Sequence, residues 1–227
     1  MFPVSRYNCR MNILHLDEHI LVLDKPAGLP VLPDGWDQDA PYLVKSLTET
    51  HGKIYVVHRL DKVTSGVMVF ARTAESHRSL SLQFEKHETA KTYHALAQGS
   101  PTWDEHRALH PLRVNVGHKH RTIVDVRSGK PSATRFRVLE RFASTCLLEG
   151  IPETGRTHQI RVHAAALGHP LLADALYGSR VNEGMARPAL HAQSLAFIHP
   201  ASRELLAFNA PYPDDFSIAL TRLRSAD

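Results

Sequence analysis

Short apolar runs rich in β-branched residues recur along the whole chain, and turn residues separate them. Residues 20–23, 54–57 and 67–71 are examples. Runs of this length, bounded by Gly, Pro, Ser or Asp, are typical of β-strands. Few helical segments lie between them, and strand and helix do not alternate regularly. This pattern favours an α+β fold around a mixed, largely antiparallel sheet over a parallel α/β fold.

The remaining elements can be predicted from periodicity and capping. Further strands are expected over residues 91–96, 134–139, 144–150, 190–198 and 204–208. Helices are expected over residues 41–50, 74–86 and 157–167. Thr73 is placed to cap the second helix, Gly168 to end the third, and Asp214 or Asp215 to cap a last one.

Length and composition indicate one folded domain. The chain has 227 residues, of which 43% are hydrophobic and 22% are charged, as in ordinary globular proteins. We expect residues 1–11 to form an N-terminal tail and residues 12–227 a single domain, which we expect to act as a monomer.

The net charge and the number of cysteines bear on the binding partner and the cellular compartment of the protein. A net charge of +4 with 16 further histidines is compatible with a polyanionic partner, but many basic proteins never meet nucleic acid. Cys9 and Cys146 are too few for a disulfide framework. We find neither a signal peptide nor an apolar run long enough to span a membrane, so the expected location is the cytoplasm.

A carboxylate stands on a polar loop between two predicted strands. His58-Arg59-Leu60-Asp61 follows the strand at 54–57, and Thr64-Ser65-Gly66 leads into the strand at 67–71. Rigid flanking strands would hold Asp61 in a good position for catalysis. From the bare pattern, a turn capped by Asp61 is the more common explanation.

A second polar group surrounds the predicted start of the helix at 157–167. Residues 154–163, Thr-Gly-Arg-Thr-His-Gln-Ile-Arg-Val-His, combine arginine forks with a helix N-terminus, which suits anions. His158 and His163 are five residues apart and lack a third partner, so no metal site is expected. Nucleotide-binding glycine motifs are missing as well, so no cofactor is expected. The basic stretch at 113–121 is a hairpin or loop that suits either solvent or RNA.

At residues 58–66 the sequence resembles the RluA family of RNA pseudouridine synthases, whose signature is His-Arg-Leu-Asp followed by Thr-Ser-Gly. The resemblance continues, in the family's order, through residues 24–29, 91–96, 129–134, 154–163, 168–170, 190–192 and 199–200. It implies the pseudouridine synthase fold, a catalytic domain over residues 12–227, and an RNA-binding cleft. Ala173 departs from the family, which usually has Gly before the aspartate at this point.

The resemblance also implies catalytic roles. Asp61 is the essential carboxylate, which either attacks C1′ of the target uridine or removes its 2′ proton. Arg161 keeps that carboxylate ionised, and Tyr93 stacks on the uracil. Leu190 packs in the same pocket.

Further residues are implied as contacts to the substrate. Arg59 fills the space that the flipped uridine leaves or holds the backbone, and His58 belongs to the same segment. Arg156 and Lys25 are candidates for phosphate contacts.

Compact members of this family, which lack an S4 RNA-binding module, modify a tRNA anticodon stem-loop, a 23S rRNA hairpin, or both. Structured RNA of these kinds is the expected partner. An inactive RNA-binding protein of the same fold is the main alternative. A glycosidase-like hydrolase would want a second acidic partner for Asp61, and none of the matching segments supplies one.

Overall fold

The computed structural model describes residues 11–33, 40–117 and 121–226. The chain divides into two compact units, each with its own hydrophobic core. Unit 1 comprises the chain up to Thr89 together with Ser194–Ala210, and unit 2 comprises Ala90–Gln193 and the chain from Pro211 onward. Strand β11 (Leu190–Ile198) contributes residues to both units.

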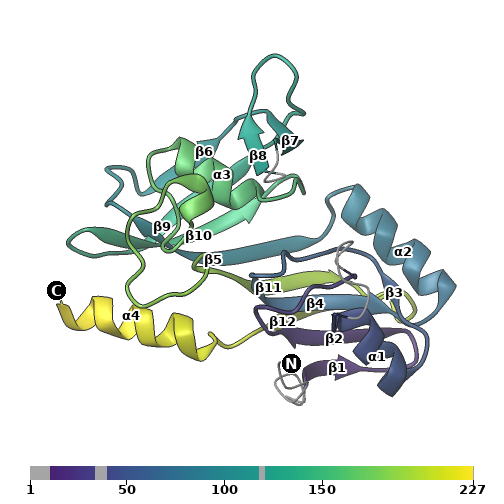
Figure 1. Ribbon diagram of the computed structural model, residues 1–227. Helices are drawn as coiled ribbons and strands as arrows, with labels where there is room; N and C mark the ends of the chain where they lie inside the picture. The colour runs from purple at the N-terminus through teal and green to yellow at the C-terminus, as the bar shows by residue number, and fades with distance from the viewer. Residues whose placement is uncertain (1–10, 34–39, 118–120, 227) are drawn as a thin grey trace. The chain divides into compact units, whose positions relative to one another are not determined.

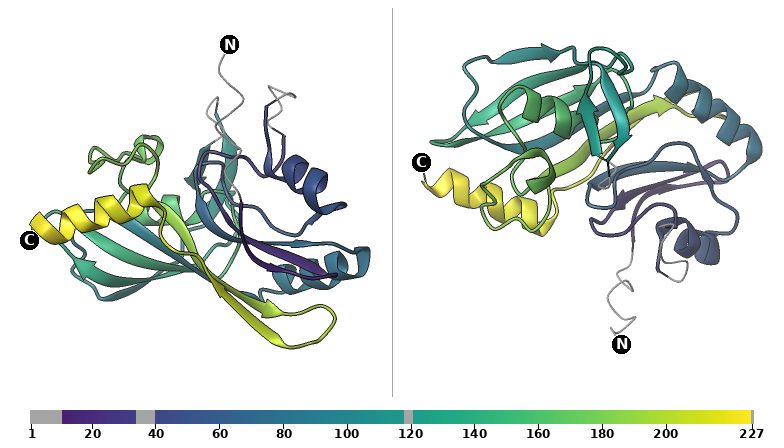
Figure 2. Two further views of the ribbon diagram at one scale, coloured as in Figure 1. Left: turned by 90° about the horizontal axis from the view of Figure 1, so that it is seen from below. Right: turned by 45° about the horizontal axis from the view of Figure 1, so that its top comes forward.

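Unit 1 is a layer of strands with a helix on each side. Its strands are β1 (Asn12–Leu16), β2 (Ile20–Lys25), β3 (Tyr55–Val56), β4 (Ser65–Ala71), the second half of β11, and β12 (Leu205–Asn209). β2 pairs with β1 on one side and with β4 on the other. β3 also pairs with β4, and β12 pairs with β11. All of these pairs are antiparallel. The helices α1 (Leu43–His51) and α2 (Ala74–Glu85) lie on opposite sides of β1, β2 and β4 (Figures 1 and 2).

Both faces of this layer are apolar, which explains why its central strands lack a polar alternation. Ile20 and Val22 of β2 join Leu80 of α2 in one core cluster. Leu21 and Leu23 point to the other face and are also fully buried. Strands covered on both faces become continuous apolar runs, which is the pattern that the sequence shows.

Unit 2 is a second layer of antiparallel strands. The strand order is β5 (Ala90–Gln98), β10 (Thr145–Pro152), β9 (Thr134–Arg141) and β6 (Glu105–Ala108). A separate hairpin is formed by β7 (Leu112–Val116) and β8 (Arg121–Val124). Three helical segments complete the unit: α3 (Gln159–Ala166), the 3-10 turn η2 (Ala175–Tyr177) and α4 (Asp214–Ala226).

Alternation along β5 and β10 divides the core of unit 2 in two. Ala95 and Leu148 face a cluster that includes Ile160 of α3. Leu96 and Leu147 face another that includes Phe216 of α4. The helices α3 and α4 therefore cover opposite faces of this layer, as Figure 1 shows.

The α+β class is confirmed, and so are most of the expected elements. Thr73 caps α2 by accepting a hydrogen bond from the amide of Ser76 at 3.1 Å. The basic stretch at 113–121 contains a hairpin, although residues 118–120 lie outside the described residues.

Several expected boundaries were wrong, including the following. The strand at 54–57 is reduced to Tyr55–Val56. Helix α3 begins two residues late because His158 has a left-handed backbone (φ 55°) that a helix cannot include. Asp214 and Asp215 lie within the first turn of α4 and therefore do not precede it as caps.

Ala173 has a backbone conformation that favours glycine. Its φ is +59°, in the left-handed region, where a Cβ costs roughly 1–2 kcal/mol. This cost explains why Gly is usual here in the family that the sequence resembles. Ala173→Gly should raise the free energy of unfolding by about 0.5–1 kcal/mol, after the extra entropy of the unfolded chain is subtracted.

Urea denaturation of the wild type and the variant measures this change. Ala175→Gly is the matched control, because Ala175 is exposed in η2 and its φ is not positive. The control should lose stability. If Ala173→Gly is less stable than the wild type, the left-handed backbone at residue 173 does not strain the protein.

Candidate active site

Asp61 lies on a tight loop of unit 1 that leads into β4. Its carbonyl accepts a hydrogen bond from the amide of Thr64 at 3.0 Å, and its side chain is half-buried. Thr64 and Ser65 are buried, with exposed fractions of 2% and 1%. Gly66 follows with a φ of +116°, a value that glycine adopts without strain. The loop is thus fixed at both ends, and its carboxylate has a defined position.

Lys25 ties the Asp61 loop to a second loop. Its side chain is fully buried, and its ammonium donates to the carbonyls of Pro26 and Leu29 at 2.8 Å and of Lys62 at 3.3 Å. The amide of Gly28 also donates to the carbonyl of Lys62, at 2.7 Å. These contacts give Lys25 a structural role beside Asp61. A phosphate contact by the same ammonium stays a prediction.

His58 and Arg59 point to different surroundings. The ring of His58 stacks on Phe84 of α2 at 4.4 Å between centroids, and its Nε2 accepts from the amide of Val69 at 3.2 Å. His58 therefore anchors the start of the loop within unit 1. Arg59, the next residue, is exposed, as a contact to RNA would require.

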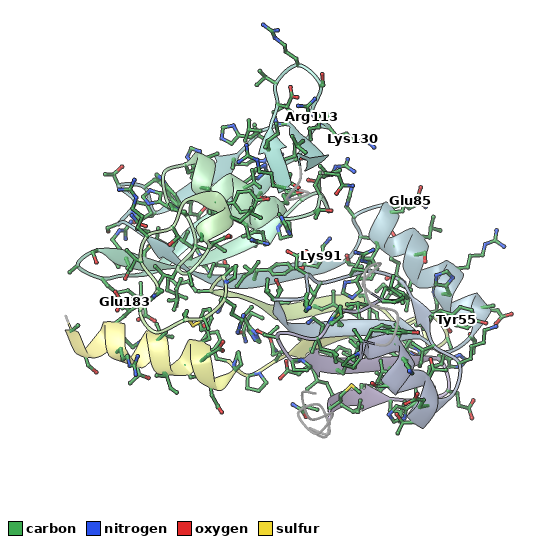
Figure 3. All side chains as sticks on the ribbon, in the orientation of Figure 1. Tyr55, Glu85, Lys91, Arg113, Lys130 and Glu183 are labelled. Carbon is green, nitrogen blue, oxygen red and sulfur yellow. The ribbon has the colours of Figure 1, made fainter. Side chains whose placement is uncertain are left out.

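Tyr93 and Leu190 come together in unit 2. Tyr93 lies on β5, opposite Gly150 of β10, and packs against the core cluster that contains Leu190. Leu190 itself is only 5% exposed. Lys91 precedes Tyr93 by two residues and so points to the same face of β5. Partial burial lowers the pKa of Lys91. Its side chain is labelled in Figure 3.

A glutamine organises the loop that carries Arg156. The buried Gln159 accepts from the amide of Arg156 at 3.0 Å and from the hydroxyl of Thr154 at 2.6 Å. Its amide group donates to the carbonyl of Ala133 and to Thr134, at 2.9 and 3.0 Å. These four hydrogen bonds join the loop at 154–156 to residues 133 and 134, so Gln159 sets the shape of the loop.

Arg161 forms a buried ion pair with Asp174. Its Nε and Nη2 donate to the two carboxylate oxygens at 2.7 and 2.8 Å, and the two side chains are 5% and 1% exposed. The Cζ atom also lies 5.0 Å from the centre of the Tyr177 ring. A planar fork suits this two-point contact, and a lysine does not. The sequence singled out Arg161 but missed Asp174 and Tyr177.

The signal for Asp174 and Tyr177 was present but weak. In the sequence, Ala173 stands where the resembling family usually has Gly, and Asp174 follows it without any sign of a partner. Nothing in a single sequence indicates that the segment at 173–177 folds back onto α3. The pairing depends on contacts between residues 13 and 16 positions apart, from Arg161 to Asp174 and to Tyr177.

Metal-binding groups and membrane-spanning helices would point to other functions. Among residues 11–33, 40–117 and 121–226, no group of three or more His, Cys, Asp or Glu side chains is arranged to hold a metal ion. Within the same ranges, no helix is long and apolar enough to cross a membrane.

Comparison with known proteins places these residues in a family. Residues 19–166 match the family of RNA pseudouridylate synthases. The large subunit pseudouridine synthase C of Vibrio cholerae is 39% identical over 94% of this chain and 70% of its own length. The dual-specificity RNA pseudouridine synthase RluA of Pasteurella multocida is 36% identical over 88% of this chain and 93% of its own.

Solved structures agree with this result. Human RNA pseudouridylate synthase domain containing 4 superposes with a TM-score of 0.77 and 27% identity, covering 94% of this chain and 93% of that one. Human RNA pseudouridylate synthase domain containing 1 gives 0.78 and 29%, covering 96% and 89%. The chain belongs to the RNA pseudouridylate synthase family, and its members are isomerases that act on RNA. Both the expected fold and the expected family are confirmed.

Loss of the Lys25 ammonium should loosen the Asp61 loop. Lys25→Met keeps most of the buried volume but removes the donor to three carbonyls. The free energy of unfolding should fall by roughly 2 kcal/mol, because buried acceptors lose their partner. Urea denaturation measures this change. Lys62→Met is the matched control in the same loop, because the Lys62 side chain is exposed, and its stability should stay within about 0.5 kcal/mol of the wild type. Equal stability of the two variants would show that the hydrogen bonds of the Lys25 ammonium do not stabilise the Asp61 loop.

Proposed function

We propose that this enzyme isomerises specific uridines to pseudouridine in structured RNA, with Asp61 as the essential carboxylate. The target is a hairpin of 23S rRNA, the anticodon stem-loop of a tRNA, or both. Family membership carries this proposal. The names of the relatives add to it, because they include large subunit rRNA synthases and a dual-specificity synthase. We further propose that the enzyme works as a monomer in the cytoplasm.

The reaction needs no redox step and no external group donor. The N1–C1′ bond of uridine breaks, the uracil turns, and C5 bonds to C1′; C5 then loses a proton and N1 gains one, so the product is an isomer of uridine. Asp61 either attacks C1′ or removes the 2′ proton, and both roles require an ionised carboxylate. A loop held by Lys25 and by buried flanking residues supports such a role, because it keeps the carboxylate in place while the base turns.

The other candidates have distinct tasks. Tyr93 stacks on the uracil and assists removal of the C5 proton, and Leu190 forms the apolar wall beside it. Their shared cluster in unit 2 supports this assignment. Arg161 favours the ionised form of Asp61. Arg59 enters the space that the flipped nucleotide leaves, and Arg156 contacts the RNA backbone. His58 and Lys25 contribute to RNA binding by holding the loop that carries Arg59 and Asp61.

Replacement of the Asp61 carboxylate should abolish the reaction. Asp61→Asn keeps the shape of the side chain but removes its charge. The single-turnover rate of pseudouridine formation should fall by roughly 10³-fold or more, with RNA affinity within about twofold of the wild type. Nucleoside mass spectrometry of 23S rRNA and tRNA transcripts measures the product.

Asp104→Asn is the matched control for this variant. The Asp104 side chain is 86% exposed and pairs with Arg141 on the surface, so activity should be unchanged. Turnover by Asp61→Asn at the rate of the control would remove Asp61 from its role. RNA binding by the wild type without any pseudouridine would favour the inactive RNA-binding alternative, and free uracil would favour a hydrolase.

Arg161 and Arg156 should act on different steps. Arg161→Lys keeps the charge that Asp174 needs but loses the planar fork, so the rate in bound RNA should fall about tenfold or more with little change in affinity. Arg156→Ala should weaken affinity and reduce its salt dependence, because it removes a phosphate contact. Binding curves and single-turnover rates at one salt concentration decide between these effects. Equal loss of affinity in both variants, with normal rates when bound, would place Arg161 on the RNA surface.

A further inference from the structure

Tyr177 connects three parts of unit 2 that are separate in sequence. Its hydroxyl accepts a hydrogen bond from the amide of Thr122 in β8 at 3.0 Å. The same hydroxyl lies 2.8 Å from Nδ1 of His158, which precedes α3. The face of its ring covers the guanidinium of Arg161. One side chain thus touches the hairpin, the start of α3 and the arginine of the proposed mechanism.

The contacts of Arg161 restrict its guanidinium in complementary ways. The two hydrogen bonds to Asp174 fix rotation within the plane of the group. The ring of Tyr177 lies with its centre 5.0 Å from Cζ and limits movement of the guanidinium toward that side. A catalytic partner must be held closely, since small displacements of a reacting group cost large factors in rate.

The hydroxyl of Tyr177 has both of its hydrogen-bonding functions in use. Burial raises the pKa of this phenol, so it keeps its proton at neutral pH. As a neutral group it accepts from the Thr122 amide and shares a second hydrogen bond with Nδ1 of His158. Residue 158 has the left-handed backbone that delays α3 to Gln159, and this hydrogen bond holds its ring there. Arg161 follows three residues later, so the start of α3 sets its position.

We propose that Tyr177 is a positioning residue, which sets the position of Arg161 and makes it depend on strand β8 of the basic hairpin. The inference rests on the proposed function, because Arg161 has its role in that reaction. The hairpin carries two exposed arginines, Arg113 (Figure 3) and Arg121, which suit an RNA backbone. RNA that seats the hairpin would thereby also steady Arg161 through the Thr122 amide and the Tyr177 ring.

Tyr177→Phe tests the link with little change in shape. It keeps an aromatic ring but removes the hydroxyl that anchors it, so Thr122 and His158 lose their partner and the ring is no longer held over Arg161. The single-turnover rate in saturating RNA should fall about tenfold, equivalent to about 1.4 kcal/mol, with RNA affinity within about twofold. Hydrogen exchange should accelerate at the Thr122 amide and, through the displaced ring, at Nε–H of Arg161. Nitrogen-15 NMR reports both groups.

Tyr212→Phe is the matched control. The Tyr212 hydroxyl also contacts Nδ1 of a histidine, His94, but Tyr212 packs in the core cluster on the α4 side of the sheet. Its loss should leave the rate and the exchange of Arg161 unchanged.

The possible outcomes separate the two proposals. If Tyr177→Phe exposes the Thr122 amide but leaves the Arg161 exchange and the rate as in the wild type, Tyr177 only anchors the hairpin and the inference is wrong. If the wild type makes no pseudouridine in any RNA tested, the proposed function fails. The exchange at Nε–H of Arg161 still decides then whether Tyr177 holds that side chain.

Discussion

The buried pair of Arg161 and Asp174 is the interaction on which the arrangement of unit 2 depends. A guanidinium that is 5% exposed needs a carboxylate partner, since an unpaired charge in such a place costs several kcal/mol. The pair joins α3 to the segment before η2 and brings Tyr177 over the same group. Asp174 directly follows Ala173, whose backbone is left-handed, so the chain turns immediately before the buried carboxylate.

Unit 1 uses a buried cation in another way. The ammonium of Lys25 has backbone carbonyls as partners and joins two loops, one of which carries Asp61. In each unit, a side chain of the proposed mechanism lies next to a loop that a buried charged group holds. In unit 1 this is Asp61, whose loop is held by Lys25. In unit 2 it is Arg161, which pairs with Asp174 in the segment before η2. Asp61 lies on a loop, whereas Tyr93 and Arg161 lie on a strand and a helix.

The fold could be read from the sequence where local rules decide it. Thr73 caps α2 as expected, and the buried runs at 20–23 and 67–71 became strands because both faces are covered. The rules failed where a distant contact prevails. His158 was expected within a helix but takes a left-handed backbone beside Tyr177. Lys25, a candidate for a phosphate contact, is fully buried. Asp61 was selected by resemblance, because from pattern alone a turn cap was the better explanation.

The central claim is that this chain converts uridine to pseudouridine at defined positions in RNA. A map of pseudouridine in total RNA, from cells with the gene and from cells that lack it, tests this claim most directly. The account predicts that one or a few sites in 23S rRNA or tRNA lose pseudouridine in the deletion. It also predicts that the wild-type gene restores them and that a gene encoding Asp61→Asn does not. Identical maps with and without the gene, or full restoration by the Asn variant, would contradict it.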